Sequence, residues 1–544
     1  MRVKEAEKVM LKKINISSKN QILIINIVLI VVILAVFWQV NHHGFVNLDD
    51  DVYVRHNRHI RSGMEGICWA FSSTYAEFWH PLTWVSLILD YQLYGPNAGG
   101  YHLTNLILHI LSTLLLFWLF NRMTGAIWKS SFVAALFALH PLHVESVAWI
   151  SERKDVLSAF FWMMTLCLYV YYTEKPVIRR YLSVLFCFVC ALMSKPIVIT
   201  LPLIMILLDY WPLGRFQSQK IEGNMTGVAL EKVSLKLLWE KIPFFVLSAV
   251  FSIITFYAQH QPYGKGFPLD SRIANAIVSF MTYPIKILWP HGLVVAYPFL
   301  VQIPLWQVLG AILLTAIISA AVIIRAKHMP YLFAGWSWYT ITILPVIGII
   351  QVGDVAMADR YSYLPSVGIA VMLAWGIPSM IRSEEIRKKI LFPAGFAVLA
   401  IMAVLSWKQC SYWNNSIDLF SHALRVTKDN FIAHNGFGYA LYEKGKMEEA
   451  VDQFNEAILI APRYAYAYNN RGSAYVKLGR YQSAMEDFNK AIDLKQDYAD
   501  AYNNRAFAYF NQRNIELGCY DAKKACAMGI CKALESANAK RDCR

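Results

Sequence analysis

The chain has 544 residues, of which 57% are hydrophobic and only 16% are charged, and its mean hydropathy is +0.38. These values exclude a single soluble domain and indicate a polytopic membrane protein. The formal net charge is +14. Because the basic residues cluster between apolar runs, the charge is typical of membrane-protein loops, and nucleic acid is not an expected partner.

Eleven apolar stretches have a length typical of membrane spans. The predicted spans are residues 21–40, 103–121, 131–148, 155–172, 181–194, 197–210, 243–260, 307–324, 331–351, 363–381 and 390–407. Residues 271–289 are less apolar and include Arg272 and Lys286, so we predict an interfacial or re-entrant helix there. Residues 1–20 lack a signal-peptide cleavage pattern and are predicted to be a cytoplasmic tail.

The basic residues between the spans predict the orientation. With the N-terminal tail in the cytoplasm, all the Lys- and Arg-rich segments fall on the cytoplasmic side, namely residues 122–129, 175–180, 215–241, 325–327 and 382–389. The opposite side then receives residues 41–102, 143–155, 259–307, 352–361 and everything after residue 407. We therefore expect an integral protein of a bacterial inner membrane whose conspicuous polar loops meet at the extracytoplasmic face.

Three consecutive aspartates, Asp49, Asp50 and Asp51, follow the first predicted span. Ionisable groups at the edge of the hydrocarbon usually pair, line a polar cavity or do chemistry. A solvated loop start or a helix cap is the alternative interpretation. From the three aspartates alone, the solvated loop start is the favoured interpretation.

A second group of polar residues lies at the ends of later spans on the same predicted side. Its members are His140, His143, Glu145, Arg153, Lys154, Asp155, Lys195, Asp359 and Arg360. The basic members suit the stabilisation of a phosphate leaving group, although snorkelling or pairing with Asp155 and Asp359 is the alternative. The two histidines with Glu145 invite a metal site, but Pro141 breaks the helix, so we favour positioning or hydrogen bonding, with a divalent cation left open.

The composition becomes polar after residue 407, and a repeat of 34 residues appears. Asn435, Asn469 and Asn503 follow this spacing, as do Ala457, Ala491 and Ala525. The pattern resembles tetratricopeptide repeats (TPRs) over residues 430–528. Stacked TPR helix pairs form a concave groove that usually binds peptides or proteins, and packing on the membrane domain or self-association is the alternative.

Four of the nine cysteines, Cys519, Cys526, Cys531 and Cys543, lie close together near the C-terminal end of the chain. An extracytoplasmic location permits two disulfides there, with no prediction of their connectivity. Zinc binding is the alternative, but the paired C-x₂-C spacing of a structural site is missing.

Several strings carry a family resemblance. Residues 45–50 (FVNLDD), 140–149 (HPLHVESVAW), 153–155 (RKD) and 359–365 (DRYSYLP), followed by TPRs, resemble the transmembrane and TPR-containing O-mannosyltransferase-like family across essentially the whole chain. The resemblance implies an all-α fold similar to GT-C glycosyltransferases, with Asp49 and Asp50 as the acidic pair of the first extracytoplasmic loop. It also implies a polyprenyl-phosphate sugar donor, with mannose as the expected sugar. Transfer of a sugar to a hydroxyl requires a carboxylate close to the acceptor, and one of Asp49 and Asp50 is expected to serve as that general base.

We therefore expect a membrane glycosyltransferase that transfers a sugar to an acceptor hydroxyl, with Ser or Thr of proteins as the expected acceptor and the TPR groove engaging it. The alternatives are a non-catalytic TPR scaffold anchored in the membrane, and a transporter or flippase of lipid-linked sugars. The predicted organisation is a tail (1–20), a GT-C-like domain of about eleven transmembrane helices (21–407, with first loop 41–102), a connector (408–429), a TPR array of about three repeats (430–528) and a cysteine-containing tail (529–544).

Overall fold

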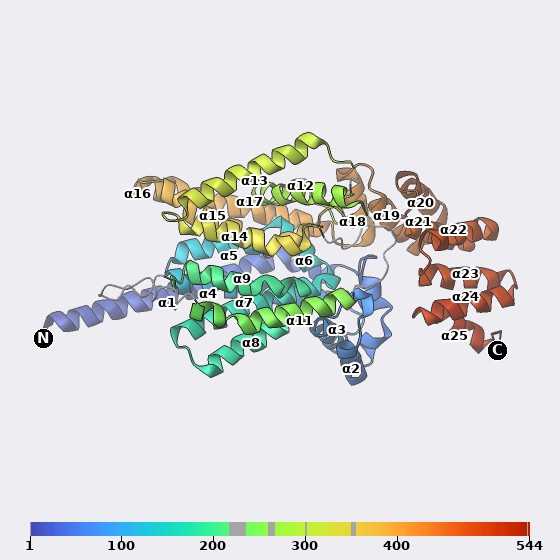
Figure 1. The fold of residues 1–544 in the computed structure, drawn as a ribbon, viewed down its shortest axis with the longest axis horizontal. Coiled ribbons are helices and arrows are strands. Elements are labelled where there is room, and N and C mark those ends of the chain that lie inside the picture. The colour runs from blue at the N-terminus through green and yellow to red at the C-terminus, as the bar shows by residue number, and fades with distance from the viewer. Residues whose placement is uncertain are drawn as a thin grey trace.

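The computed structural model describes residues 2–216, 235–258, 267–299, 302–349, 355–540 and 542–543. These residues form helices and connecting turns, with one isolated antiparallel bridge between Pro298 and Val355. Figure 1 shows a long helical bundle with a smaller helical array at one end. The N-terminus lies at the far end of the bundle and the C-terminus lies in the array, so the chain is elongated.

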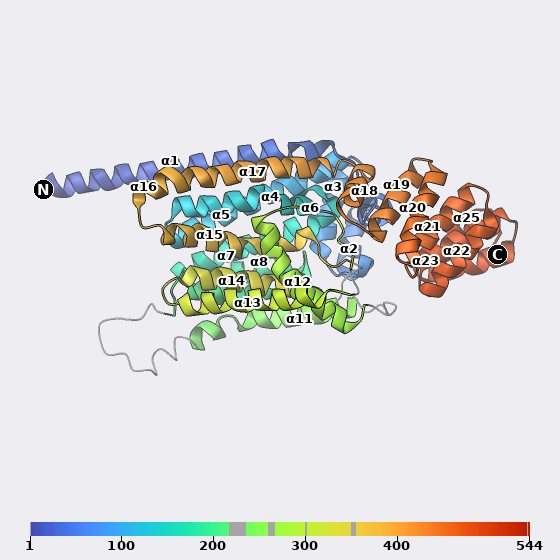
Figure 2. The same ribbon diagram turned by 90° about the horizontal axis from the view of Figure 1, so that it is seen from above.

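Every predicted span coincides with a helix of the bundle. These helices are α1 (Arg2–Phe37), α4 (Ala98–Thr124), α5 (Ile127–Leu139), α7 (Arg153–Glu174), α8 (Ile178–Leu192), α9 (Leu201–Tyr210), α11 (Ile242–Ala258), α13 (Leu305–Arg325), α14 (Pro330–Ile343), α15 (Ser366–Met380) and α17 (Phe392–Ser411). They run largely along the long axis of the molecule in both views (Figures 1 and 2). The first helix includes the predicted tail without a break.

Not all of these helices are long enough to cross a membrane. Among the described residues, six helices pass by length and composition, and a seventh crossing is formed if α5 and residues 141–148, bent by 51°, count as one span. Helices α8, α14 and α15 have 15, 14 and 15 residues. At 1.5 Å per residue, each reaches only about 22 Å of a hydrocarbon core that is about 30 Å thick. The prediction thus located the helices, and among the described residues six or seven of them are long and apolar enough to cross a membrane.

The predicted interfacial helix at residues 271–289 is α12 (Leu269–Leu288). It is not among the candidate membrane spans, and it contains Pro284. Three of the segments used to predict orientation are covered only in part, because residues 217–234, 259–266, 300–301 and 350–354 lie outside the described part of the chain.

Close packing joins the short helices to the long ones. Helix α7 packs against α4 and α8, and α14 packs against α15. The α14–α15 contact brings Gly335 and Gly368 together, because a Cβ added at Gly368 would lie 2.3 Å from the Gly335 carbonyl oxygen. Only glycine permits this approach of two backbones. The short helices are therefore held in the bundle by close packing.

The first loop forms a compact layer between the bundle and the array. Its short helices are η1 (Trp38–His42), η2 (Asp51–Arg55), η3 (Arg58–Arg61), α2 (Met64–Ser72), η4 (Tyr75–Glu77) and α3 (Pro81–Tyr94). Trp84 of α3 is fully buried and stacks on Tyr53 with ring centroids 4.7 Å apart. Beside this layer, Pro141 ends α5, and the chain turns through η5 (Pro141–His143), α6 (Val144–Ala148) and η6 (Ile150–Glu152) before α7 begins.

The C-terminal helices confirm the TPR prediction. After α18 (Ser416–Val426), three pairs stack, namely α19 (Phe431–Glu443) with α20 (Met447–Ile460), α21 (Ala465–Lys477) with α22 (Tyr481–Leu494), and α23 (Ala499–Asn511) with α24 (Ile515–Ala527). The buried rings of Phe454 and Phe488 pack between the two helices of their pairs. Small residues lie opposite these rings, because a Cβ added at Gly472 would lie only 2.8 Å from the Phe488 ring. The repeating asparagines link neighbouring pairs, because the Asn504 side chain donates to Asn469 at 3.0 Å.

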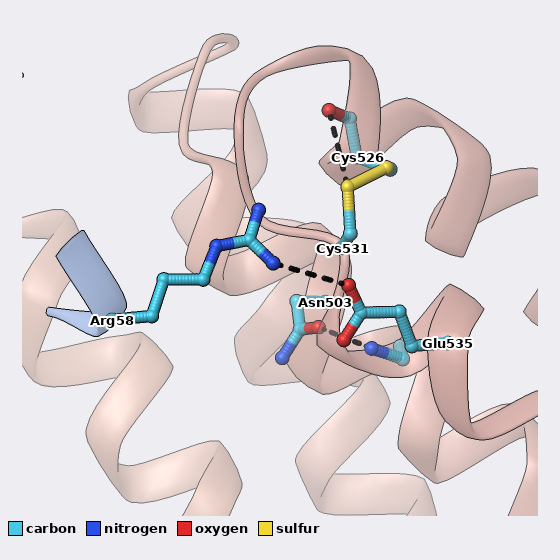
Figure 3. The surroundings of a disulfide bond; sticks show 6 residues. Arg58, Asn503, Cys526, Cys531 and Glu535 are labelled. Carbon is cyan, nitrogen blue, oxygen red and sulfur yellow. Dashed lines mark hydrogen bonds and ion pairs between the residues drawn. A yellow bond between two sulfur atoms is a disulfide. The ribbon is translucent and has the colours of Figure 1, made fainter. Parts of the chain in front are cut away.

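A final helix, α25 (Lys532–Ala539), packs on α24 and ends the array. The four clustered cysteines form two disulfides, Cys519–Cys543 and Cys526–Cys531. The second joins the end of α24 to the residue before α25 (Figure 3). The predicted cysteine-containing tail is thus a capping helix pinned to the last TPR pair.

Candidate active site between the first loop and the bundle

Asp50 connects the first loop to the start of α7. Its Oδ2 accepts a hydrogen bond from the Val46 backbone N–H at 3.0 Å, and its Oδ1 accepts bonds from the backbone N–H and the hydroxyl of Ser151 at 3.0 and 2.6 Å. The residue is only 1% exposed. Burial raises the pKa of the Asp50 carboxyl to about 7, although the hydrogen bonds from Ser151 and Val46 oppose this shift.

Asp49 differs from its neighbour in exposure and in partners. Its side chain is half exposed, and one carboxylate oxygen lies 3.7 Å from the Lys154 ammonium. That separation is longer than a hydrogen bond, so Asp49 can approach an incoming group without breaking a tight contact. Asp51 faces elsewhere and pairs with Arg55 at 2.6 Å. The three consecutive aspartates therefore have three different environments.

A buried carboxylate, Glu152, lies at the centre of the charged cluster. Its Oε1 lies 3.3 Å from Lys154 Nζ and 3.2 Å from Arg360 Nε, and its Oε2 lies 3.3 Å from Lys195 Nζ. Three cations thus meet at one acid: Lys154 lies two residues away in the chain, and Lys195 and Arg360 come from distant segments. Each cation keeps between 11% and 15% of its side chain exposed, whereas Glu152 is almost completely buried. Glu152 therefore holds the cations in place from behind while their exposed sides stay accessible.

Two further acids complete the cluster. Asp155 is hydrogen-bonded to Lys195, and Glu145 is hydrogen-bonded to the Arg360 guanidinium. The Arg360 backbone N–H also donates to Glu145 at 3.2 Å. These contacts fix the direction of each cation, as expected for charge-assisted hydrogen bonds in a partly desolvated site.

Aromatic rings border the cluster. Lys154 Nζ lies 4.7 Å from the centroid of the Tyr53 ring, and Arg360 lies over Trp149 at 5.2 Å. Such contacts favour the charged forms of both side chains. Buried Trp149 has an indole N–H without a hydrogen-bond partner within the described structure, so a donor is available beside the cations.

Asp359 lies next to Arg360 but belongs to a different contact. It is buried, and its Oδ1 accepts a hydrogen bond from the Tyr297 hydroxyl at 2.7 Å. Burial raises the pKa of Asp359 well above its usual range, and the nearby charge of Glu145 acts in the same direction. Its role in this structure is therefore to hold the segment that carries Arg360.

Three predicted site residues are engaged in separate contacts. Arg153 is fully buried and binds Asp90 at 2.6 Å, the Asn105 side chain and the Tyr101 carbonyl. His140 Nε2 lies 2.9 Å from the Ile287 carbonyl oxygen, and His143 lies 2.7 Å from the Phe137 carbonyl and 3.0 Å from the Ser366 hydroxyl. These side chains join helices, and we do not include them in the proposed site.

A metal site is not evident from the donor set. Within the described ranges, no group of three or more His, Cys, Asp or Glu side chains is arranged to hold a metal ion. The acids of the cluster are already paired with Lys154, Lys195 and Arg360. The carboxylates of the cluster are therefore engaged by the protein's own cations.

Two residues of this site were missed by the sequence reasoning. Glu152 and Ser151 directly precede the Arg153–Lys154–Asp155 string, and neither was singled out. A signal for Glu152 was present, because an additional acid at the membrane edge next to basic residues usually has a partner. Ser151 had no signal, since its importance comes from a contact with Asp50, 101 positions away.

The TPR array contacts the loop that carries the aspartates. The Asn47 backbone N–H donates to the Ser416 hydroxyl at 2.9 Å, and the Asn47 side chain donates to the Gly436 carbonyl at 3.2 Å. On the other side of Asp49 and Asp50, Arg55 pairs with Glu443 at 3.0 Å. The candidate site therefore lies at the end of the bundle that bears the array (Figures 1 and 2).

Comparisons with known proteins identify a repeat family and a group of similar proteins. The TPR repeat family matches residues 438–479 and 472–512. Protein O-mannosyl-transferase Tmtc3 of Drosophila melanogaster is 23% identical over 441 residues, which cover 68% of this chain and 47% of that protein. Protein O-mannosyl-transferase TMTC4 of Homo sapiens is 24% identical over 426 residues, which cover 70% of this chain and 57% of that protein.

The chain is similar to the TMTC protein O-mannosyl-transferases. The resemblance inferred from the motifs is thereby confirmed, and the chain spans about half the length of the curated relatives it matches. Among solved structures, a TPR protein described as having an unusual peptide-binding site covers 41% of this chain and 97% of its own at 16% identity. Its TM-score of 0.21 is too low to support an argument.

Proposed function

We propose that this protein is a membrane glycosyltransferase that moves a sugar from a polyprenyl-phosphate carrier to a hydroxyl of a protein, with mannose as the sugar indicated by its relatives' names. The observation that supports this most directly is the half-exposed Asp49 beside Lys154, in a cluster that also contains Lys195 and Arg360. A base and a set of anion-binding groups are the two components that such a transfer needs.

In the proposed reaction, the Asp49 carboxylate takes the proton of the acceptor hydroxyl while the acceptor oxygen forms a bond to the anomeric carbon. The bond between that carbon and the phosphate oxygen breaks, and its electron pair stays on the polyprenyl phosphate. A single displacement of this kind inverts the anomeric configuration. The leaving phosphate gains negative charge, which Lys154, Lys195 and Arg360 stabilise through their exposed sides.

Asp50 acts as a positioning residue in this proposal. Both of its oxygens accept hydrogen bonds from Val46 and Ser151, so it holds the loop against the start of α7 and fixes the direction of Asp49. Asp49 and Asp50 thus have different roles in this proposal, because Asp49 is half exposed and Asp50 is buried. We place the reaction on the extracytoplasmic side, because the positive-inside rule puts the loop with Asp49 and Asp50 there.

The test uses purified full-length protein in lipid nanodiscs, a panel of polyprenyl-phosphate sugars and Ser- or Thr-containing peptides. We expect Asp49→Asn to lower kcat by roughly 10²- to 10⁴-fold, the usual size of a general-base contribution. Asp50→Asn should cost less, because the amide oxygen can still accept from Ser151. Asp270→Asn, which removes an acid from the first turn of α12, is the matched control and should keep wild-type activity.

Three outcomes decide between the hypotheses. Transfer that survives both Asp49→Asn and Asp50→Asn would show that the catalytic assignment is wrong. A larger loss for Asp50→Asn than for Asp49→Asn would reverse their roles. Transfer from a sugar nucleotide in the absence of any polyprenyl-phosphate sugar would contradict the carrier.

A further inference from the structure

A short basic segment of the first loop lies against the TPR array. Residues 55–61 read RHNRHIR and contain three arginines without an acid. The segment is anchored in the first loop, because Ile60 is fully buried in the apolar cluster that contains Tyr53 and Trp84. Arg55 and Arg58 point away from this anchor and reach the array.

Acids from both ends of the array meet this segment. Glu443, at the end of the first TPR helix, pairs with Arg55 at 3.0 Å. Glu535, in the capping helix α25, pairs with Arg58 at 3.6 Å (Figure 3). Asp500 of α23 interacts electrostatically with Lys495 of the array and with His56 of the segment. The segment therefore meets acids from three helices of the array.

The contacts are individually weak. The side chains of Arg58 and Glu535 are 77% and 64% exposed, and those of Arg55 and Glu443 are about one-third exposed. Exposed ion pairs of this kind contribute little and are screened by salt. A competing basic chain can therefore displace the loop, whereas a neutral or acidic chain gains nothing from the same acids.

We propose that the TPR array recognises an extended basic segment of a partner protein, and that residues 55–61 of this chain take its place in the present structure. Charge complementarity between the array and the loop identifies the partner's chemistry as rich in Arg or Lys. The Cys526–Cys531 disulfide helps to hold Glu535 in place. It joins α24 to the residue before α25, and helix α25 carries Glu535. The inference concerns binding and stands apart from the transfer reaction.

Displacement of the loop also reaches the candidate site. Arg55 is shared between Glu443 of the array and Asp51, which lies two residues after Asp49. A basic partner that takes Glu443 leaves Arg55 with Asp51 alone. Partner binding and the conformation of the aspartate loop are therefore linked through one guanidinium.

The test measures binding of fluorescein-labelled 12-residue peptides by anisotropy, with no sugar donor present. The full-length protein is used in nanodiscs of phosphatidylcholine, a zwitterionic lipid that limits binding of peptides to the membrane, and empty nanodiscs give the background. We expect an Arg-rich peptide to bind in 50 mM salt and to weaken clearly at 300 mM, and we expect Glu-rich and neutral peptides not to bind.

Two double variants separate the array from the loop. Glu443→Gln with Glu535→Gln should weaken binding of the Arg-rich peptide, because the acids are removed. Arg55→Gln with Arg58→Gln should tighten it by roughly three- to tenfold, because the internal competitor is lost. Glu448→Gln removes an exposed acid that pairs with Arg480 inside the array and serves as the control without effect.

The loop variant makes the proposal falsifiable. Unchanged or weaker binding after Arg55→Gln with Arg58→Gln overturns it, and so does binding of the Glu-rich peptide at equal affinity. A variant that loses sugar transfer but binds the peptides as the wild type does would bear on the proposed function and not on this inference.

Discussion

Two buried ionic clusters lie towards the two ends of α7, and they differ in how completely they are closed. The cluster near Glu152 surrounds the start of the helix, and the other surrounds Tyr169, 17 residues later and therefore about 25 Å away along the axis. In the second cluster, Asp209 and Lys241 are completely buried and lie 2.5 Å apart. Tyr169 donates to Asp209 at 2.6 Å, and Arg215 binds Glu240 at 3.0 Å.

The difference indicates different roles. In the closed cluster, Asp209 and Lys241 are each satisfied within it and face no open side, which is typical of a structural lock between α7, α9 and α11. In the open cluster, three cations converge on Glu152 and keep an exposed side. A buried charge network can thus serve stability or binding, and the central pair distinguishes these two clusters. Asp209 and Lys241 are both completely buried, although Arg215 at the edge of their cluster is 21% exposed. Around Glu152, by contrast, all three cations are partly exposed.

Removing the central cation of the closed cluster should have the largest effect on stability. Lys241→Met leaves Asp209 buried with one fewer cation, and breaking a buried pair typically costs about 3–5 kcal/mol. We expect a clear fall in the midpoint of thermal unfolding, followed by tryptophan fluorescence, with near-normal donor binding by the protein that remains folded. A midpoint equal to that of the wild type would show that the cluster is not a lock.

A pH titration should give an effect of intermediate size at the open end. Asp50 has neutral donors but no cation partner, and its pKa in the folded protein is about 7 against a usual value of 3.8. The unfolded chain therefore loses this proton first, so the free energy of unfolding falls as the pH rises from about 4 to about 7 and then levels off. Between pH 5 and pH 8 the fall should be about 2–3 kcal/mol.

The variant Asp50→Asn isolates this contribution from all other titrating groups. It should lack the fall, so the difference in unfolding free energy between wild type and variant should change with pH by that amount. Parallel pH profiles for the two proteins would contradict the environment assigned to Asp50.

We expect the smallest effect on stability for Lys195→Met, the substitution in the open cluster that corresponds to Lys241→Met in the closed one. Glu152 keeps Lys154 and Arg360 as partners, and Asp155, which loses Lys195, keeps the hydrogen bond from the Ser146 hydroxyl. Lys195 is also partly exposed, whereas Lys241 is completely buried, so the unfolding midpoint should change less than in Lys241→Met. Affinity for a polyprenyl-phosphate sugar should fall by roughly tenfold, as expected for the loss of one charge-assisted contact. Isothermal titration of both variants compares them directly, and a reversed pattern would exchange the roles of the two clusters.

The sequence identified most of the charged side chains at the candidate site but could not group them. Arg153 and Lys154 are consecutive and were treated alike. Successive residues of a helix point about 100° apart, so Arg153 faces Asp90 while Lys154 faces Glu152. The importance of Glu152 and Ser151 arises from partners 43 to more than 200 positions away, and no local pattern encodes such contacts.

The sequence by itself determined the all-helical membrane class, the positions of the bundle helices and the TPR array. These properties follow from hydropathy and periodicity, which add up over neighbouring residues. Only the tertiary structure decided that Asp49 is exposed while Asp50 is buried, that Lys154, Lys195 and Arg360 share one acid, and that several apolar helices are too short to cross alone. The reason is that burial, charge pairing and helix ends depend on packing between segments far apart in the chain.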